Sequence, residues 1–112
     1  MEYRTITDAY AVAGQITPED VPAIKAAGFK SVICNRPDNE QPGQPAADAV
    51  KAAVEAAGLE FRYIPVISGQ ITGENVEDMA EALGTLKEPV FAYCRSGARC
   101  TNLYMLVQQA KA

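Results

Sequence analysis

The segment from Val90 to Cys100 constrains the fold of this chain more than any other. Its sequence, VFAYCRSGARC, starts as a short apolar run, passes through a cysteine and a glycine-containing loop, and enters a helical pattern. In a strand-loop-helix unit of this kind, the loop amides and the first helical turn present positive potential to one small space. We therefore expect an α/β fold in which this loop forms an anion cradle, with Cys94 at its floor.

The residues around Cys94 favour its ionised form. Arg95 and Arg99 add positive charge, and the helix dipole acts in the same direction, so we expect a thiolate with a lowered pKa that serves as a nucleophile. Arg99 is the second candidate catalytic residue, and Arg95 is a candidate anion ligand. The alternatives are a buried structural cysteine and solvated arginines. The backbone N–H groups expected to line the cradle belong to Ser96, Gly97 and Ala98.

Composition narrows the classes of function. The chain has 112 residues, a formal net charge of −4 and no histidine. The acidic balance gives no sign of nucleic-acid binding, and no apolar run reaches membrane-spanning length. The missing histidine removes Ser-His-Asp and Cys-His catalysis. We expect one domain over residues 1–112, without a cofactor.

The three cysteines do not form a familiar metal or disulfide pattern. Cys34, Cys94 and Cys100 match no structural zinc spacing, so no metal site is predicted. No secretory signal is visible at the N-terminus, and a disulfide framework is therefore not expected. A reducing cytoplasm and thiol chemistry suit these cysteines better.

Strand patterns alternate with helix patterns along the whole chain. This order predicts a three-layer α/β domain with a mostly parallel sheet of four to five strands, flanked by helices. Strands are expected near 3–13, 30–35, 59–66 and 89–93, and helices near 17–28, 46–57, 72–86 and 98–109. Residues expected in the core include Tyr63, Met79, Phe91, Tyr93, Leu103, Met105, Leu106 and Val107.

The candidate site residues follow the carboxyl ends of strands. In parallel sheets ligands bind at that edge, and Cys94, Arg36 and the loop after Val66 all lie there. Arg36 supplies either a third positive charge for an anion or a structural salt bridge. It opens a polar, proline-rich loop, residues 36–45, which is either functional or simply a solvated surface.

Two motifs and the order of elements resemble a known family. Residues 35–38 read NRPD and residues 94–99 read CRSGAR. With these motifs the chain resembles the cysteine-dependent dual-specificity phosphatase fold over nearly its whole length. It is more closely similar to the phosphatase-like domain of the bacterial beta-lactamase hydrolase-like family, whose members have been labelled phosphatases and sulfur transferases. The resemblance also implies a metal-hydrolase partner domain, which that family often carries.

The chain departs from the phosphatase pattern at three points. The phosphatase motif, Cys-x5-Arg, would place its arginine at position 100, where this chain has Cys100; the loop from Cys94 to Arg99 has the six-residue size of a rhodanese loop. Tyr93 replaces the usual histidine, and Cys100 replaces a serine or threonine, so the thiolate has a weaker donor there. Residues 67–73 contain no acid to protonate a leaving group.

These departures favour sulfur transfer. The leading hypothesis is a sulfurtransferase that carries sulfane sulfur from thiosulfate or a persulfide on Cys94 and passes it to a thiol acceptor. The first alternative is a protein tyrosine or dual-specificity-like phosphatase that acts on aryl phosphates through a phosphocysteine, with Glu74 or Asp78 as a source of the proton.

The second alternative is a redox-sensing, anion-binding module without turnover. In it Cys34 or Cys100 would be the resolving thiol that pairs with Cys94. Plain core packing is the competing explanation for both of these cysteines, since free cysteines are usually buried.

Overall fold

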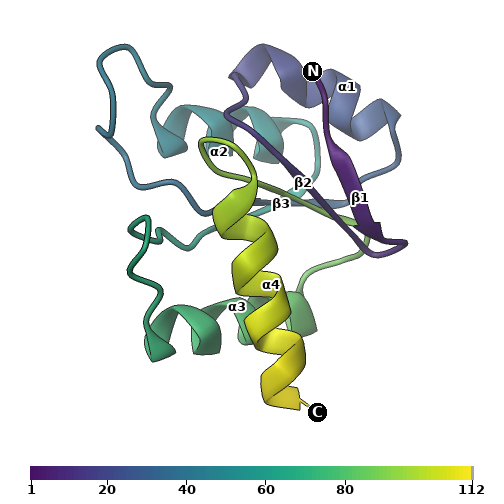
Figure 1. Ribbon diagram of the computed structural model, residues 1–112. Helices are drawn as coiled ribbons and strands as arrows, with labels where there is room; N and C mark the ends of the chain where they lie inside the picture. The colour runs from purple at the N-terminus through teal and green to yellow at the C-terminus, as the bar shows by residue number, and fades with distance from the viewer. Residues whose placement is uncertain (112) are drawn as a thin grey trace.

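The computed structural model describes residues 1–111, and its centre is a five-stranded sheet in the order β1-β2-β5-β3-β4 (Figure 1). Strand β1 runs antiparallel to β2, and the other three pairings are parallel. The mostly parallel α/β sheet is therefore confirmed. The strands are β1 (Arg4–Thr7), β2 (Tyr10–Ala13), β3 (Ser31–Cys34), β4 (Glu60–Tyr63) and β5 (Val90–Tyr93).

Helices cover both faces of this sheet, and three layers result (Figure 1). One face carries η1 (Pro18–Asp20), α1 (Val21–Ala26) and α2 (Ala47–Ala56); the other carries α3 (Gly73–Thr85) and α4 (Ala98–Lys111). Side chains alternate between the two faces along each strand. In β5, Phe91 and Tyr93 pack toward α1 and α2, whereas Val90 and Ala92 pack toward α3 and α4.

Local signals set the element boundaries. The Thr17 N–H donates to the Asp20 carboxylate (2.9 Å) at the start of η1, and Thr72 Oγ1 accepts from the Asn75 N–H (3.1 Å) at the start of α3. The strand expected over 59–66 is shorter because Pro65 has no N–H to donate. The backbone pairing nevertheless continues, since the Val66 N–H reaches the Asn35 carbonyl (3.0 Å).

Three residues expected in the core lie at the surface instead. Tyr63 is 42% exposed because β4 is an edge strand. Its hydroxyl accepts from the Asp38 N–H (3.0 Å) in the polar loop 36–45. Met105 and Leu106 lie on the outer side of α4, at 50% and 37% exposure. The other expected core residues, Met79, Phe91, Tyr93, Leu103 and Val107, are buried.

The loops that follow β3, β4 and β5 emerge at the same end of the sheet (Figure 1). This is the edge where the sequence places the candidate site. Over residues 1–111, no helix has both the length and the apolar character needed to cross a membrane.

Candidate active site

Cys94 lies directly after β5, at the start of a tight loop that leads into α4. Its side chain is 1% exposed, and its sulfur accepts a hydrogen bond from the Gly97 N–H at 3.0 Å. The loop closes this tightly because Gly97 has a φ of 93°, a conformation that side-chain-bearing residues rarely adopt. A Cβ at this position would also lie 3.5 Å from the Ala13 backbone.

The surroundings of Cys94 hold its thiol largely ionised. Hydrogen bonding by the Cys100 side chain lowers the pKa of Cys94 most, and burial opposes it. Backbone N–H groups of Cys100, Ser96 and Arg99 lower it further, so that the Cys94 pKa falls from the ordinary 9.0 to about 5. The sequence indicated a weak donor at Cys100; in the fold, this thiol is the largest single stabiliser of the thiolate.

The amides around the sulfur differ in one member from the expected set. The Ser96 and Gly97 N–H groups contribute, as expected. The Ala98 N–H instead donates to the Ser96 hydroxyl oxygen at 3.4 Å. The Arg99 and Cys100 amides act in its place, because they belong to the first turn of α4 and point back toward the sulfur.

Arg99 is held by a carboxylate from a distant loop. Its Nη1 donates to Glu40 Oε2 (2.7 Å) and to the Val66 carbonyl (2.8 Å), and its Nη2 donates to Glu40 Oε1 (2.9 Å). Glu40 raises the pKa of Arg99 most, and the nearby Cys94 thiolate raises it further. Arg99 therefore lies between Glu40 and the sulfur.

Arg36 forms the salt bridge that was one of its two expected roles. Its Nε donates to Glu40 Oε1 at 2.9 Å, and its Nη1 and Nη2 donate to Gln15 and Gln41, each at 3.0 Å. The side chain is almost fully buried. Arg36 thus braces Glu40, which in turn holds Arg99. Direct contact between Arg36 and an anion stays a prediction.

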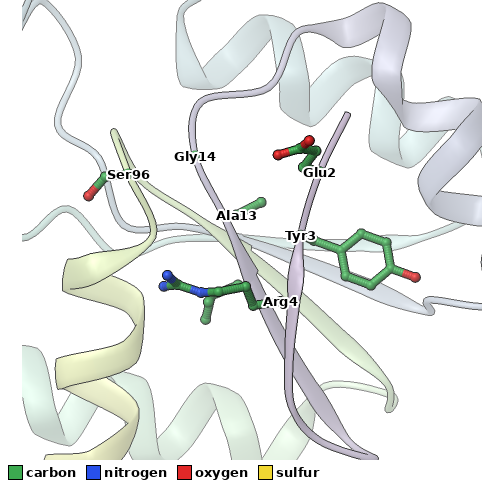
Figure 2. Close-up of a pocket in the computed structure, with 7 residues that line it drawn as sticks. Glu2, Tyr3, Arg4, Ala13, Gly14 and Ser96 are labelled. Atoms are coloured by element: carbon green, nitrogen blue, oxygen red, sulfur yellow. The ribbon is translucent and has the colours of Figure 1, made fainter.

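Arg95 lies at the surface. Its side chain forms no hydrogen bond or salt bridge within residues 1–111, and it lines a hollow together with Glu2 and Asp20. This placement favours the solvated charge over the anion ligand. A second hollow of about 240 Å³ lies beside the loop, with Arg4 reaching past Ala13 toward the start of α4 (Figure 2).

The two other cysteines lie on opposite faces of the sheet. Cys100 packs in the same cluster as Cys94, between the sheet and α3 and α4. Cys34 packs in the cluster under α1 and α2, and its thiol faces the Arg36 carbonyl at 3.3 Å. Burial raises the pKa of both thiols. Of the two candidate resolving thiols, Cys100 is therefore the better placed.

Within residues 1–111, no carboxyl group is placed to protonate a leaving group at the site. Residues 67–71, in the loop between β4 and α3, contain no carboxyl group. Glu74 and Asp78 are exposed on α3. The carboxyl group that does contact Arg99 belongs to Glu40. Hydrogen bonding from Arg99 lowers the pKa of Glu40 to about 2, so it is ionised at neutral pH.

Glu40 is the residue of the candidate site that the sequence did not predict. Its signal was weak: a glutamate four residues after Arg36, inside a proline-rich loop. Groups of three or more side chains able to hold a metal do not occur in the part of the chain that the structure describes.

A family model described as "Beta-lactamase hydrolase-like protein, phosphatase-like domain" matches residues 2–112. The chain belongs to this family. Among curated relatives, a beta-lactamase hydrolase-like protein of Agrobacterium fabrum is 40% identical over 101 residues, which is 90% of this chain and 23% of that protein. One from Xylella fastidiosa is 35% identical over 106 residues, or 95% of this chain and 25% of that protein. The chain thus spans about a quarter of the length of these relatives.

Solved structures confirm the phosphatase-like fold. A Neisseria meningitidis Z2491 protein described as a "putative phosphatase" superposes with a TM-score of 0.88 and 34% identity, covering 97% of this chain and 78% of that one. The core catalytic domain of the PP-IP phosphatase SIW14 from S. cerevisiae has a TM-score of 0.64 over 85% of this chain and 56% of that one. At 12% identity, the second likeness concerns the fold alone.

Proposed function

We propose that this phosphatase-like domain is a cysteine-dependent sulfurtransferase. The observation that carries the proposal is that, among residues 1–111, no protonated carboxyl group stands beside the buried Cys94 thiolate. Glu40, the carboxyl group in contact with Arg99, has a pKa of about 2, and the loop over 67–71 contains no acid. Chemistry at this site therefore suits a leaving group that departs as a stable anion.

Sulfur transfer from thiosulfate meets that condition. The Cys94 thiolate attacks the outer sulfur of thiosulfate and forms a new S–S bond, while the bond from that sulfur to the sulfonate breaks. Sulfite leaves with the electron pair and needs no proton. An acceptor thiolate then attacks the terminal sulfur of the Cys94 persulfide, takes it as its own persulfide and restores the Cys94 thiolate.

The dimensions of the cradle also favour sulfur. The loop from Cys94 to Arg99 has six residues, one fewer than the phosphatase motif. At least one loop amide, that of Gly97, already contacts the Cys94 sulfur directly at 3.0 Å. A smaller ring of donors suits the terminal sulfur of a persulfide better than a full tetrahedral phosphate ester.

A phosphatase limited to activated esters is the second candidate, and the comparisons favour it. The family is described as phosphatase-like, and the Neisseria meningitidis structure bears the description of a phosphatase. In this reaction Cys94 displaces a phenolate and forms a phosphocysteine that water hydrolyses. Aryl phosphates would react, whereas alkyl phosphates would turn over very slowly, since an absent general acid costs about 10²–10⁴-fold in rate.

One experiment separates the two candidates. The purified chain is incubated with thiosulfate, and in parallel with an aryl and an alkyl phosphate. Sulfur transfer adds the mass of one sulfur atom to the Cys94 peptide and yields thiocyanate when cyanide is the acceptor. Cys94→Ser abolishes the adduct, and the matched control Cys34→Ser, on the other sheet face, retains it. Phosphate release without a sulfur adduct would refute the sulfurtransferase, and turnover of alkyl phosphates would refute the argument from the missing acid.

The biological setting is part of the proposal. The small anionic donor, the thiol acceptor and a cytoplasmic site of action follow from the chemistry of Cys94. The curated relatives are about four times as long as this chain. We therefore propose that a further domain, such as a metal hydrolase, acts together with this one.

A further inference from the structure

The hollow of about 240 Å³ beside the cysteine loop has walls from three segments of the chain (Figure 2). Glu2 and Arg4 line it from the N-terminal segment and the start of β1, Ala13 from the end of β2, and Ser96 from the loop itself. Pockets for drug-sized ligands usually measure about 300–1,000 Å³. A hollow below that range suits a molecule of about amino-acid size.

Two opposite charges line this hollow without pairing. Glu2 and Arg4 are exposed, and within residues 1–111 neither side chain forms a hydrogen bond or a salt bridge. Figure 2 shows both side chains extending from their segment toward the side on which the cysteine loop lies. A ligand with a carboxylate and an ammonium group satisfies both residues, whereas a plain anion is attracted by Arg4 and repelled by Glu2.

The hollow adjoins the Cys94 sulfur across one residue of the loop. Arg4 Nη2 lies 3.5 Å from the position that a Cβ of Gly97 would occupy, and the Gly97 N–H donates to the sulfur at 3.0 Å. Because the N and Cβ positions of one residue are about 2.5 Å apart, Arg4 Nη2 lies no more than about 9 Å from the sulfur. The N–H of Ser96, which lines the hollow, also lowers the pKa of Cys94.

This span matches the reach of a small thiol that carries an amino-acid end. The path from the Cys94 sulfur through an outer sulfur, the acceptor sulfur and its carboxylate to an arginine N–H covers up to about 10 Å. A carboxylate two carbon atoms from the acceptor sulfur therefore reaches Arg4 while the two sulfurs meet.

We propose that this hollow is the acceptor subsite and binds the amino-acid end of a small thiol, with Arg4 on the carboxylate and Glu2 on the ammonium group. The proposal rests on the sulfurtransferase function proposed above and names its acceptor class. The acceptor thiolate forms a bond to the terminal sulfur of the Cys94 persulfide, and the bond from that sulfur to Cys94 breaks. The electron pair stays on Cys94 as the thiolate, and the proton stays on the transferred sulfur.

The test uses disulfides as probes, because they need the Cys94 thiolate but no sulfur donor. Cys94 attacks one sulfur of the probe, half of the probe leaves as a thiolate, and the mass of the Cys94 peptide reports the mixed disulfide. Cystine carries carboxylate and ammonium groups, cystamine carries only ammonium groups, and hydroxyethyl disulfide carries neither. We expect the wild-type chain to react with cystine about ten-fold faster than with hydroxyethyl disulfide, since each exposed ion pair contributes up to about five-fold.

Substitutions of the two charged residues should have different signatures. In Arg4→Gln the cystine rate should fall about five-fold while the cystamine rate does not fall. In Glu2→Gln the cystine and cystamine rates should both fall. Hydroxyethyl disulfide should react at the wild-type rate in both variants, because it reports only the thiolate. Arg62→Gln, on the strand at the opposite edge of the sheet, and Glu55→Gln, exposed on α2, are the matched controls and should behave as wild type.

The outcomes separate the subsite from the proposed function. Equal wild-type rates for cystine and hydroxyethyl disulfide, or an Arg4→Gln rate that falls equally for all three probes, overturn the subsite, and a Cys94 persulfide formed from thiosulfate leaves the proposed function standing. If thiosulfate forms no persulfide while cystine is still preferred, the amino-acid subsite stands, and its role for an acceptor is overturned together with the proposed function. A Cys94 that reacts with none of the probes overturns both.

Discussion

Replacing Cys100 by alanine should raise the pKa of Cys94 without changing the residues that contact the substrate. Cys100 is fully buried, and hydrogen bonding by its side chain is the largest of the effects that lower the Cys94 pKa to about 5. Alanine fills much of the same space but donates nothing. The thiolate would then depend on the backbone N–H groups of the loop.

The size of the effect follows from the donor that is lost. A hydrogen bond to a charged group contributes about 1.5–3 kcal/mol, and a thiol is a weak donor at or below the low end of that range. Since one pKa unit corresponds to about 1.36 kcal/mol, the Cys94 pKa should rise by about one unit, to about 6. At about pH 5 the thiolate fraction would fall from about one half to about one tenth, whereas at about pH 8 it would hardly change.

The assay follows the ultraviolet absorbance of the thiolate and the rate of Cys94 alkylation as functions of pH. Cys100→Ser, with a stronger donor, should keep the midpoint at or below the wild-type value. Cys34→Ala is the matched control, because Cys34 is equally buried but packs on the opposite face of the sheet. A Cys100→Ala midpoint equal to that of wild type, or a Cys34→Ala midpoint that rises as much, would refute the reasoning.

Three further outcomes are expected. Gly97→Ala, at a φ of 93°, should lose about 1–2 kcal/mol of stability and should also lose sulfate binding, measured as protection of Cys94 against alkylation by iodoacetamide. Gly58→Ala, at a φ of 82° and with open space around it, should lose only the stability. Equal sulfate binding in the two variants would contradict the close approach of the loop to the Ala13 backbone. The pKa of Glu40 in the folded chain is lowered from 4.5 to about 2, so its carboxylate stabilises the fold above about pH 4.5, and this contribution is lost as the pH falls toward 2. After solvent screening the contribution amounts to about 1 kcal/mol. The free energy of unfolding of Glu40→Gln, measured as a function of pH, should lack this decline. Mild peroxide should convert Cys94 to a sulfenic acid that Cys100 resolves to a disulfide with release of water, and peptide maps that show Cys94 stopping at the sulfenic acid would reject the redox-sensing alternative.

Most of the architecture could be read from neighbouring residues. The apolar runs, the helix caps at Thr17 and Thr72 and the glycine after α2 act over a few positions, and the observed elements lie within one to three residues of the expected ranges at most boundaries. Strand β4 is the main exception, since a proline interrupts it. Surface exposure was harder to predict: an edge strand and the outer side of the last helix expose Tyr63, Met105 and Leu106, whose apolar character suggested the core.

The candidate site also has one part that the sequence could predict and one part that it could not. The cysteine, the glycine and the arginine of the loop lie within six residues of one another, so the sequence could predict that they form one site. The assignment of the resolving thiol depended on the register of β3 against β5, which pairs Cys34 with Tyr93 and so sends Cys34 and Cys94 to opposite faces. A shift of one residue would have reversed that result, and the sequence contains no signal for it.

The sequence by itself determined that a cysteine in a glycine-containing loop follows a buried strand and precedes a helix, because backbone hydrogen bonding and side-chain periodicity are local. The tertiary structure alone decided which groups ionise that cysteine and orient its arginine. Cys100 approaches the sulfur only once the loop has closed. Glu40 and Arg99 are 59 positions apart in sequence, and they meet only because β3 and β5, the strands that precede them, pair side by side. Charge and hydrogen bonding act over a few ångströms of space, so such partners become visible only in the folded chain.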